Sequence, residues 1–333
     1  MAAPAVSVIL PFFNAETTLR PAIASILQQR FQDWELIAFD DGSDDGSLQL
    51  VEALAAKDPR IQVLSAAHRG IVPTLREACV IARGRFLARM DADDVAHPER
   101  LGLQMAAMEA DPAAAVCGAR VRIAGAAIGL GRRRYEAWIN RLVRHEDMVR
   151  ELFVECPLPH PTFFMRRDAY EQTGGYRNQG WPEDYDLIMR FWRAGWRLIK
   201  TPEILLEWHD RPGRLSMTSP CYAEAAFRAL KRHFLFASYL KADTRFFQWG
   251  AGEVGKRWLR EWGPQRPECV VDVHPRKIGR MIHGYPVVAP EALPSPGDAF
   301  ILVAVGARGA RTEIRDYLNA RGYKELQNYL FLA

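Results

Sequence analysis

The sequence predicts an α/β protein with a doubly wound parallel sheet, followed by a second and smaller α/β unit. Apolar runs of strand length alternate with segments of helical spacing up to about residue 94, which is the pattern of parallel strands joined by crossover helices. The alternation restarts at Asp243, after a basic and aromatic segment. Ligands of such sheets bind beyond the carboxyl ends of the strands, so polar residues there are the candidates for a functional site.

The first part of the chain provides four strands and the three helices that join them. Leu19, Ile23 and Ile26 fall on one side of the first helix, as a helix packed on a sheet requires. In order, the expected strands are residues 6–13, 34–41, 61–66 and 85–94, and the expected helices are residues 16–29, 47–59 and 71–84.

The middle of the chain is expected to complete this domain. Residues 116–129 are rich in small side chains and predict a pair of strands, with the arginines at 132–134 in the connection after them. A strand, a helix and a turn follow at 160–176, then an amphipathic helix at 182–195 that is closed by Gly195, and a basic helix at 228–241.

Composition limits the classes of function. The 333 residues are 49% hydrophobic and 25% charged, which fits a soluble protein of about two domains. The net charge of +4 comes from interspersed charges, so no nucleic-acid partner is expected. The cysteines lie far apart, which predicts neither a zinc site nor a disulfide framework; they are Cys79, Cys117, Cys156, Cys221 and Cys269.

The N-terminus has no basic leader, and its apolar run has only the length of a strand. We therefore expect a cytoplasmic protein, with a peripheral position at the inner face of the membrane as an alternative. The basic aromatic segment 227–241 either lies against a membrane or packs as a helix between domains. A homo-oligomer also remains open.

Three carboxylates, Asp91, Asp93 and Asp94, follow the fourth expected strand. Side chains alternate along an extended segment, so Asp91 and Asp93 point the same way, and Asp94 points to the other face or into the next turn. Two converging carboxylates repel each other unless a cation lies between them, and hard oxygen ligands favour Mg²⁺ or Mn²⁺. The alternative for Asp94 is a cap on the helix that begins near Pro98.

Asp40 and Asp41 end the second expected strand in the same manner, ahead of a Gly-Ser turn. A carboxylate in this position can accept hydrogen bonds from the NH edge of a ring such as uracil. The same residues are also common in ordinary turns.

Seven motifs taken together resemble the family 2 glycosyltransferases, which have the A-type nucleotide-sugar fold, a Rossmann-like mixed sheet with flanking helices. The resemblance covers about residues 5 to 220. It implies inverting, metal-dependent transfer of a sugar from a nucleotide-sugar, most often UDP-linked, to a hydroxyl of a glycan or lipid-linked acceptor in cell-surface polysaccharide biosynthesis. In order, the motifs are VSVILPFFN, ELIAFDDGSDDGS, AHRGI, ARGRFLARMDADDVAHPERL, HPTFFMRR, GGY and PEDYDLIMR.

The resemblance also implies a domain organisation. It predicts a catalytic domain at 1–240 and a further domain at 241–333. Within the first, the expected parts are a nucleotide-binding half at 1–110, an acceptor half at 111–220 and a connecting helix at 221–240.

The resemblance places the donor on the first half. Asp41 matches the carboxylate that recognises the base, and Phe13 lies where a ring covers the uracil. Asp91 and Asp93 match the pair that holds the metal and the diphosphate, with direct ligation by Asp94 left open. The same comparison places three further residues around the nucleotide: Pro11, Asn14 and Arg69. A core position for Phe13 and a solvated loop charge for Arg69 are the alternatives.

Asp184 matches the base that takes a proton from the acceptor hydroxyl. Glu183 is expected to orient that base or the acceptor, and His160 and Trp181 are expected to line the acceptor side. Acids are also favoured at the start of a helix by the macrodipole, and a packed histidine is the alternative for His160.

Residues 207–219 resemble the loop that closes over the diphosphate in this family. In that reading His209 completes the metal shell, and Arg214 and Ser216 bind phosphate oxygens. A structural role for His209 is the alternative.

The last 90 or so residues contain Gly250, Gly252 and Gly255 in the GxGxxG pattern, and Asp272 closes the next strand about twenty residues on. The stretch resembles the small Rossmann-like domains attached to some sugar-modifying enzymes. It is short for a complete dinucleotide domain, so a docking module without a ligand is the alternative.

Three functions follow from these observations. The first is an inverting glycosyltransferase. The second is a bifunctional or regulatory protein whose C-terminal domain binds a nucleotide or NAD(P). The third is a non-catalytic nucleotide-sugar-binding protein, against which the intact Asp91, Asp93 and Asp184 argue.

Overall fold

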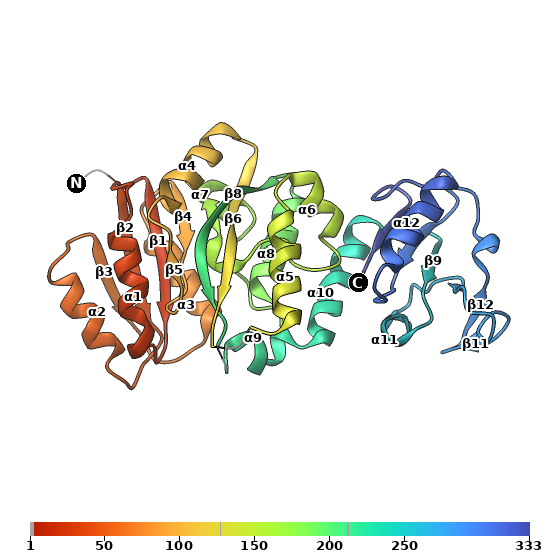
Figure 1. The fold of residues 1–333 in the computed structure, drawn as a ribbon, viewed down its shortest axis with the longest axis horizontal. Helices are drawn as coiled ribbons and strands as arrows, with labels where there is room; N and C mark the ends of the chain where they lie inside the picture. The colour runs from red at the N-terminus through yellow and green to blue at the C-terminus, as the bar shows by residue number, and fades with distance from the viewer. Residues whose placement is uncertain (1–2, 127, 212) are drawn as a thin grey trace. The chain divides into compact units, whose positions relative to one another are not determined.

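The computed structural model describes residues 3–126, 128–211 and 213–333, and it divides into two units (Figure 1). The first unit runs to Met148 and resumes at Pro157–Tyr222. The second unit consists of Val149–Cys156 and Ala223–Ala333. Within the described residues, no helix combines the length and the apolar composition needed to cross a bilayer.

The first unit is built on an eight-stranded mixed sheet in the order β3-β2-β1-β4-β7-β6-β8-β5. Its first four strands are parallel, as the sequence predicts, and their carboxyl ends therefore lie at one edge. β7 is antiparallel to both of its neighbours, and β5 is antiparallel to β8. The strands are β1 (Val6–Phe12), β2 (Trp34–Asp40), β3 (Ile61–Ser65), β4 (Phe86–Arg89), β5 (Val95–Ala96), β6 (Ala114–Ala124), β7 (Phe164–Arg166) and β8 (Arg197–His209).

The predicted pair of strands at 116–129 is wrong, because β6 is a single strand that pairs with β8. The small residues of β6 allow close packing on the strand and do not form a turn. A Cβ added at Gly118 would lie 2.6 Å from Cδ2 of Leu158, so glycine leaves room for that side chain to pack on the strand in its present position. The arginines at 132–134 lie in a helix instead of a connection.

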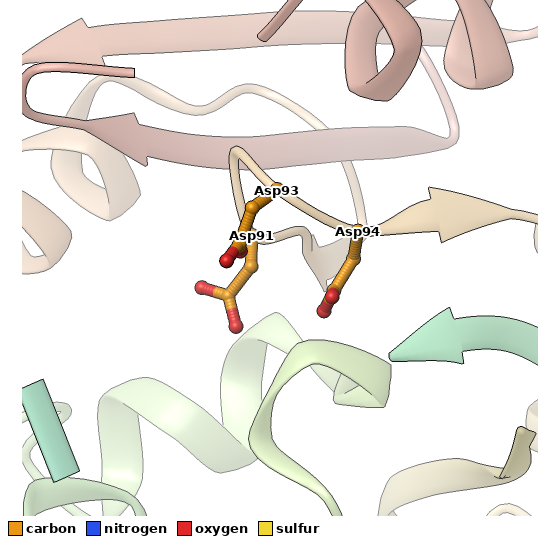
Figure 2. A group of neighbouring side chains, drawn as sticks. All are labelled: Asp91, Asp93 and Asp94. Atoms are coloured by element: carbon orange, nitrogen blue, oxygen red, sulfur yellow. The ribbon is translucent and has the colours of Figure 1, made fainter. Parts of the chain in front are cut away.

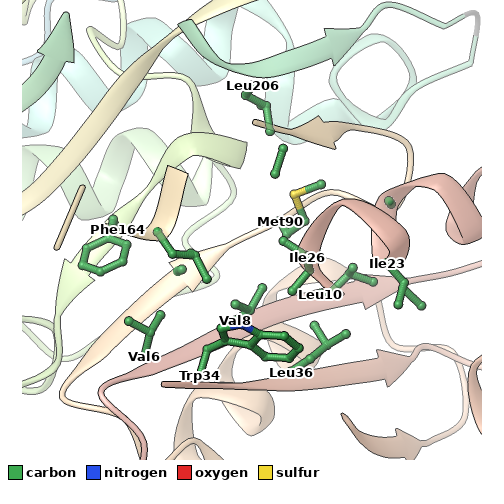
Figure 3. Close-up of a cluster of buried hydrophobic side chains, with 14 of the residues drawn as sticks. Val6, Val8, Leu10, Ile23, Ile26, Trp34, Leu36, Met90, Phe164 and Leu206 are labelled. Atoms are coloured by element: carbon green, nitrogen blue, oxygen red, sulfur yellow. The ribbon is translucent and has the colours of Figure 1, made fainter. Parts of the chain in front are cut away.

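The core of the first unit fills the space between the parallel strands and the helices on them (Figure 3). Val8 and Leu10 of β1 pack with Ile23 and Ile26 of the first helix, whose apolar spacing the sequence shows. The helices of this unit are α1 (Glu16–Leu27), α2 (Ser47–Ala55), α3 (Ile71–Ile81), α4 (Arg100–Ala110), α5 (Leu130–Arg141), α7 (Arg167–Gln172), α8 (Glu183–Arg193) and α9 (Leu215–Thr218), with 3-10 turns η1 (His160–Thr162) and η2 (Pro220–Tyr222). α6 (His145–Glu151) spans the division between the units.

The second unit has a six-stranded sheet in the order β11-β12-β10-β9-β13-β14, parallel except for β11. The first strand of this unit, β9, lies inside the sheet, and the later strands are added on both sides of it. This is the doubly wound arrangement. The elements are α10 (Glu224–Ser238), β9 (Phe246–Trp249), α11 (Glu253–Glu261), β10 (Val270–Val271), β11 (Met281–Ile282), β12 (Tyr285–Val288), η3 (Pro290–Ala292), β13 (Phe300–Val303), α12 (Ala310–Ala320) and β14 (Tyr329–Phe331).

The helix expected to connect two domains, α10, is part of the second unit. Arg228 pairs with Glu261 at 2.8 Å, and the Lys231 ammonium donates to the carbonyl of Val154 at 2.7 Å. Leu230 is fully buried. One face of α10 is therefore packed within the second unit.

We expect Gly255→Ala to destabilise the second unit by about 3 kcal/mol, because overpacking against backbone cannot relax easily. The added Cβ would meet the carbonyl oxygen of Gly250 at 1.9 Å. Gly252→Ala is the matched control, since no atom lies within 4 Å of its Cβ position. Calorimetric unfolding of the full chain measures both, and equal melting curves for the two variants would contradict this account of the packing.

Candidate active site

An acidic turn, Asp91 to Asp94, follows β4 at the carboxyl edge of the parallel strands. Carboxylate oxygens of Asp91, Asp93 and Asp94 lie within 4.8 Å of one another, and Figure 2 shows the three side chains leaving this turn toward the same space. Of the two orientations expected for Asp94, the one on the other face of the strand is wrong, because β4 ends at Arg89 and the chain then turns.

Asp94 does not cap the next helix either. Its Oδ1 accepts a hydrogen bond of 2.8 Å from the backbone N–H of His209, while α4 begins only at Arg100. Its Oδ2 is buried and has no hydrogen-bond partner. Burial and the charges of Asp91 and Asp93 raise the pKa of Asp94 well above its ordinary value.

The acidic turn fits a divalent cation. A buried carboxylate oxygen without a partner is costly, and like charges nearby increase that cost. Burial and the charge of Asp91 also raise the pKa of Asp93. A cation among the three carboxylates would satisfy the orphaned oxygen and cancel the repulsion. Oxygen-only ligands suit Mg²⁺ or Mn²⁺.

We expect Asp94→Asn to stabilise the metal-free protein by about 1–2 kcal/mol at neutral pH. The folded-state pKa of Asp94 is raised, so the wild type loses stability as pH rises through that pKa, and the variant escapes this loss. Asparagine keeps an oxygen for the His209 N–H. Melting temperatures in chelator at about pH 5 and about pH 8 measure the difference. A variant less stable than wild type at both pH values would contradict this.

Arg89, which the sequence analysis did not single out, connects the acidic turn with the acids of α8. Its buried guanidinium forms an ion pair with Asp91 and donates to the carbonyl of Met90. Burial raises the pKa of Glu183, and the charge of Arg89 opposes part of that rise. The sequence does contain a signal for Arg89, because it stands inside the apolar run RFLARM. A buried arginine seldom lacks a charged or polar partner.

Glu183, at the first position of α8, lies in a buried polar cluster. The Tyr222 hydroxyl lies 2.8 and 2.7 Å from its two carboxylate oxygens, and Nδ1 of His160 lies 3.8 Å from Oε1. Burial and the charge of Arg89 hold the pKa of His160 well below its ordinary value, so its ring is neutral. Nε2 of His160 is 2.7 Å from the hydroxyl of Tyr176.

Asp184 follows at the next position of α8 and is only half-buried. Burial first, then the charges of Glu183 and Asp184, and to a lesser extent Asp91, raise the pKa of Tyr222. Trp181 is held by a 3.0 Å hydrogen bond from its indole to Asp186, which in turn pairs with Arg190. Asp186 therefore has a structural role, since it holds both Trp181 and Arg190. No sequence pattern pointed to Tyr222.

The loops after β1 and β2 are tied together. The amide oxygen of Asn14 accepts from the N–H of Asp44 at 3.0 Å, and Asn14 has a φ of 48°. Pro11 is buried inside β1. These contacts fix the first loop beside the Gly-Ser turn.

Asp41 accepts hydrogen bonds from the backbone N–H groups of Arg69 and Gly70, at 3.0 and 2.9 Å. The Phe13 ring is 45% exposed, so it is not a core residue, and it stacks on His68 at 4.2 Å between ring centroids. The Arg69 side chain points to Glu77, at 2.7 Å.

The segment after β8 returns to the acidic turn. Arg211 lies 3.7 Å from Asp93, and Asp210 pairs with Arg214 and, at 3.2 Å, with Arg132. His209 is outside the group of converging carboxylates, and its Nδ1 is buried without a partner. Ser216 lies in α9.

In the second unit the glycine pattern lies between β9 and α11. The carboxylate of Asp272 accepts from the N–H of Ala251 at 2.9 Å and from Lys277 at 2.9 Å. The buried side chain of Gln248 donates to the carbonyls of Gly250 and Gly255. Gly252 is the N-cap of α11. The N–H of Ala251 and the carbonyls of Gly250 and Gly255 therefore have partners within the protein.

Comparison with known proteins gives a consistent result for the first unit. Residues 7–174 match the model of Glycosyl transferase family 2. The protein named glycosyltransferase EpsE of Bacillus subtilis is 33% identical over 210 residues, which are 61% of this chain and 72% of EpsE. The Escherichia coli enzyme WfgD, a UDP-Glc:alpha-D-GlcNAc-diphosphoundecaprenol beta-1,3-glucosyltransferase, is 36% identical over 31% of this chain and 40% of its own length.

Two solved structures share the fold. TarS of S. aureus in complex with UDP-GlcNAc has a TM-score of 0.56 at 18% identity, covering 71% of this chain and 68% of its own. The mannosyltransferase PcManGT of Pyrobaculum calidifontis, in complex with GDP-Man and Mn²⁺, has a TM-score of 0.52 at 19% identity, covering 71% of this chain and 63% of its own. At these identities the likeness establishes the fold.

Proposed function

The chain belongs to glycosyl transferase family 2, and from this premise we propose that it transfers a sugar, with inversion, from a UDP-sugar to a hydroxyl of a glycan or lipid-linked acceptor. We propose further that the reaction requires Mg²⁺ or Mn²⁺ and serves the synthesis of a surface polysaccharide. One observation carries the proposal: three converging carboxylates, one with an orphaned buried oxygen, lie at the carboxyl edge of the sheet. The UDP-GlcNAc bound to TarS and the UDP-Glc in the name of WfgD support the choice of donor, and the Mn²⁺ bound with GDP-Man to PcManGT supports the choice of cation.

The transfer is a single displacement. The carboxylate of Asp184 takes the proton of the acceptor hydroxyl, whose oxygen then forms a bond to the anomeric carbon. The bond from that carbon to the diphosphate oxygen breaks on the opposite face, and its electron pair stays on the diphosphate. One displacement inverts the configuration of the anomeric carbon.

Residues around the acidic turn hold the donor in this mechanism. Asp41 and the exposed ring of Phe13 bind the base, and Arg214 and Ser216 bind phosphate oxygens. Asp91 and Asp93, with Asp94 beside them, would hold the cation, which would neutralise charge on the leaving diphosphate. Glu183, kept in place by Tyr222, orients the acceptor side.

A donor screen tests the proposal. The purified full-length protein is incubated with UDP-, GDP- and dTDP-sugars, with Mn²⁺, with Mg²⁺ or with chelator, and release of the nucleoside diphosphate is measured. We expect release from at least one UDP-sugar that depends on the cation. Release that is equally fast in chelator would contradict the metal dependence, and release from GDP- or dTDP-sugars alone would contradict the choice of donor.

A further inference from the structure

Two short segments beside the acidic turn expose large apolar side chains. Leu130, at the start of α5, is 76% exposed, and in α9 Met217 is 65% and Leu215 is 47% exposed. Single exposed apolar residues are common and need no explanation, but three of them gathered in two neighbouring segments are unusual.

The two segments lie side by side in the first unit. The N–H of Asp210 donates to the carbonyl of Ala124 at 2.7 Å, and Arg132 lies 3.2 Å from Asp210. Figure 1 shows α9 near the end of α5 at which the chain enters that helix. The exposed side chains of both segments therefore belong to one region of the surface.

This region has an excess of basic residues. Residues 130–136 and 210–219 contain five arginines and two acids. Arg211 pairs with Asp93 of the acidic turn, so part of this excess is balanced by that turn. Asp210 is shared by Arg132 and Arg214, and Glu136 pairs with Arg133 at 3.0 Å. Arg134 is exposed beside them.

We propose that the surface formed by Leu130, Arg133, Arg134, Leu215 and Met217, here called the basic-apolar surface, binds an anionic phospholipid bilayer. Exposed leucine and methionine side chains enter the interface between headgroups and acyl chains, and arginines attract the acidic headgroups. The positive charge selects an anionic membrane over a neutral one.

The position of this surface indicates how the membrane contact would serve sugar transfer, and this step of the inference rests on the proposed function. Arg211 lies 3.7 Å from Asp93, and the N–H of His209 binds Asp94, so the residues that precede α9 contact the acidic turn. A protein that rests on the basic-apolar surface brings this turn toward the lipid, where an acceptor carried on a lipid is found.

Vesicle co-sedimentation of the full-length protein tests the membrane contact. We expect binding to vesicles of phosphatidylcholine with phosphatidylglycerol, weak binding to phosphatidylcholine alone, and a decrease with salt. Leu130→Ser combined with Met217→Ser should lower the partition coefficient at least about tenfold. Arg134→Gln should lower it about fivefold.

Met281→Ser is the matched control, because Met281 is 64% exposed in the second unit and lies next to Arg280. It should bind as wild type does. The absence of wild-type binding, or a loss in Met281→Ser with none in the double variant, would overturn the proposal. Melting temperatures of the variants equal to that of the wild type would exclude misfolding as the cause of lost binding. The assay contains neither donor nor acceptor, so its outcome is independent of the outcome of the donor screen.

Discussion

Replacement of Asp184 by asparagine is expected to lower kcat for sugar transfer by about 10²- to 10⁴-fold, the range for loss of a positioned base. Asparagine has nearly the same shape but cannot take the proton of the acceptor hydroxyl. Donor binding should not change, because the donor is assigned to the acidic turn, the first two loops and the segment after β8. Steady-state rates with the best donor of the screen, together with calorimetric donor affinity, separate the two effects.

The other explanation of Asp184 is helix stabilisation, since acids are favoured in the first turn. Asp168→Asn is the control for it. Asp168 is also the second residue of a helix, α7, and its Oδ1 accepts from the next N–H at 2.8 Å, as Oδ1 of Asp184 does at 2.7 Å. Asp168→Asn should retain the wild-type rate. Full activity of Asp184→Asn would show that another group is the base.

Replacement of Asp93 by asparagine is expected to weaken Mn²⁺-dependent donor binding at least about 100-fold, because even the outer partners of metal ligands contribute 10- to 100-fold. The metal-free variant should be no less stable than wild type, because burial and the neighbouring charge of Asp91 already disfavour the ionised Asp93. Its melting temperature in chelator checks this. Wild-type donor affinity in Asp93→Asn would remove Asp93 from the metal site.

The parallel half of the sheet was predictable because β1, β2 and β4 contain apolar runs and are buried along their whole length, as is typical of parallel strands. For β7 the strand itself was expected within residues 160–176, but not its antiparallel pairing with β4 and β6. β5 is only two residues long, which is too short for a periodic signal. For β6, glycine and alanine suggested a turn, although at Gly118 they make room for a side chain from another segment.

The residues of the candidate site were predictable where they stand in motifs, and not where they depend on tertiary contacts. The convergence of Asp94 with Asp91 and Asp93 depends on a turn after β4, which strand periodicity does not describe. Tyr222 reaches Glu183 across 39 positions of the sequence, a contact that only the folded chain creates.

The central claim is that a dication and a sugar-bearing diphosphate share the acidic turn. Titration calorimetry with the best nucleotide-sugar, in the presence of Mn²⁺ and then in chelator, tests it most directly. The account predicts tight donor binding with the cation, and little binding in chelator or in Asp93→Asn. Equal affinity in all three experiments would contradict it.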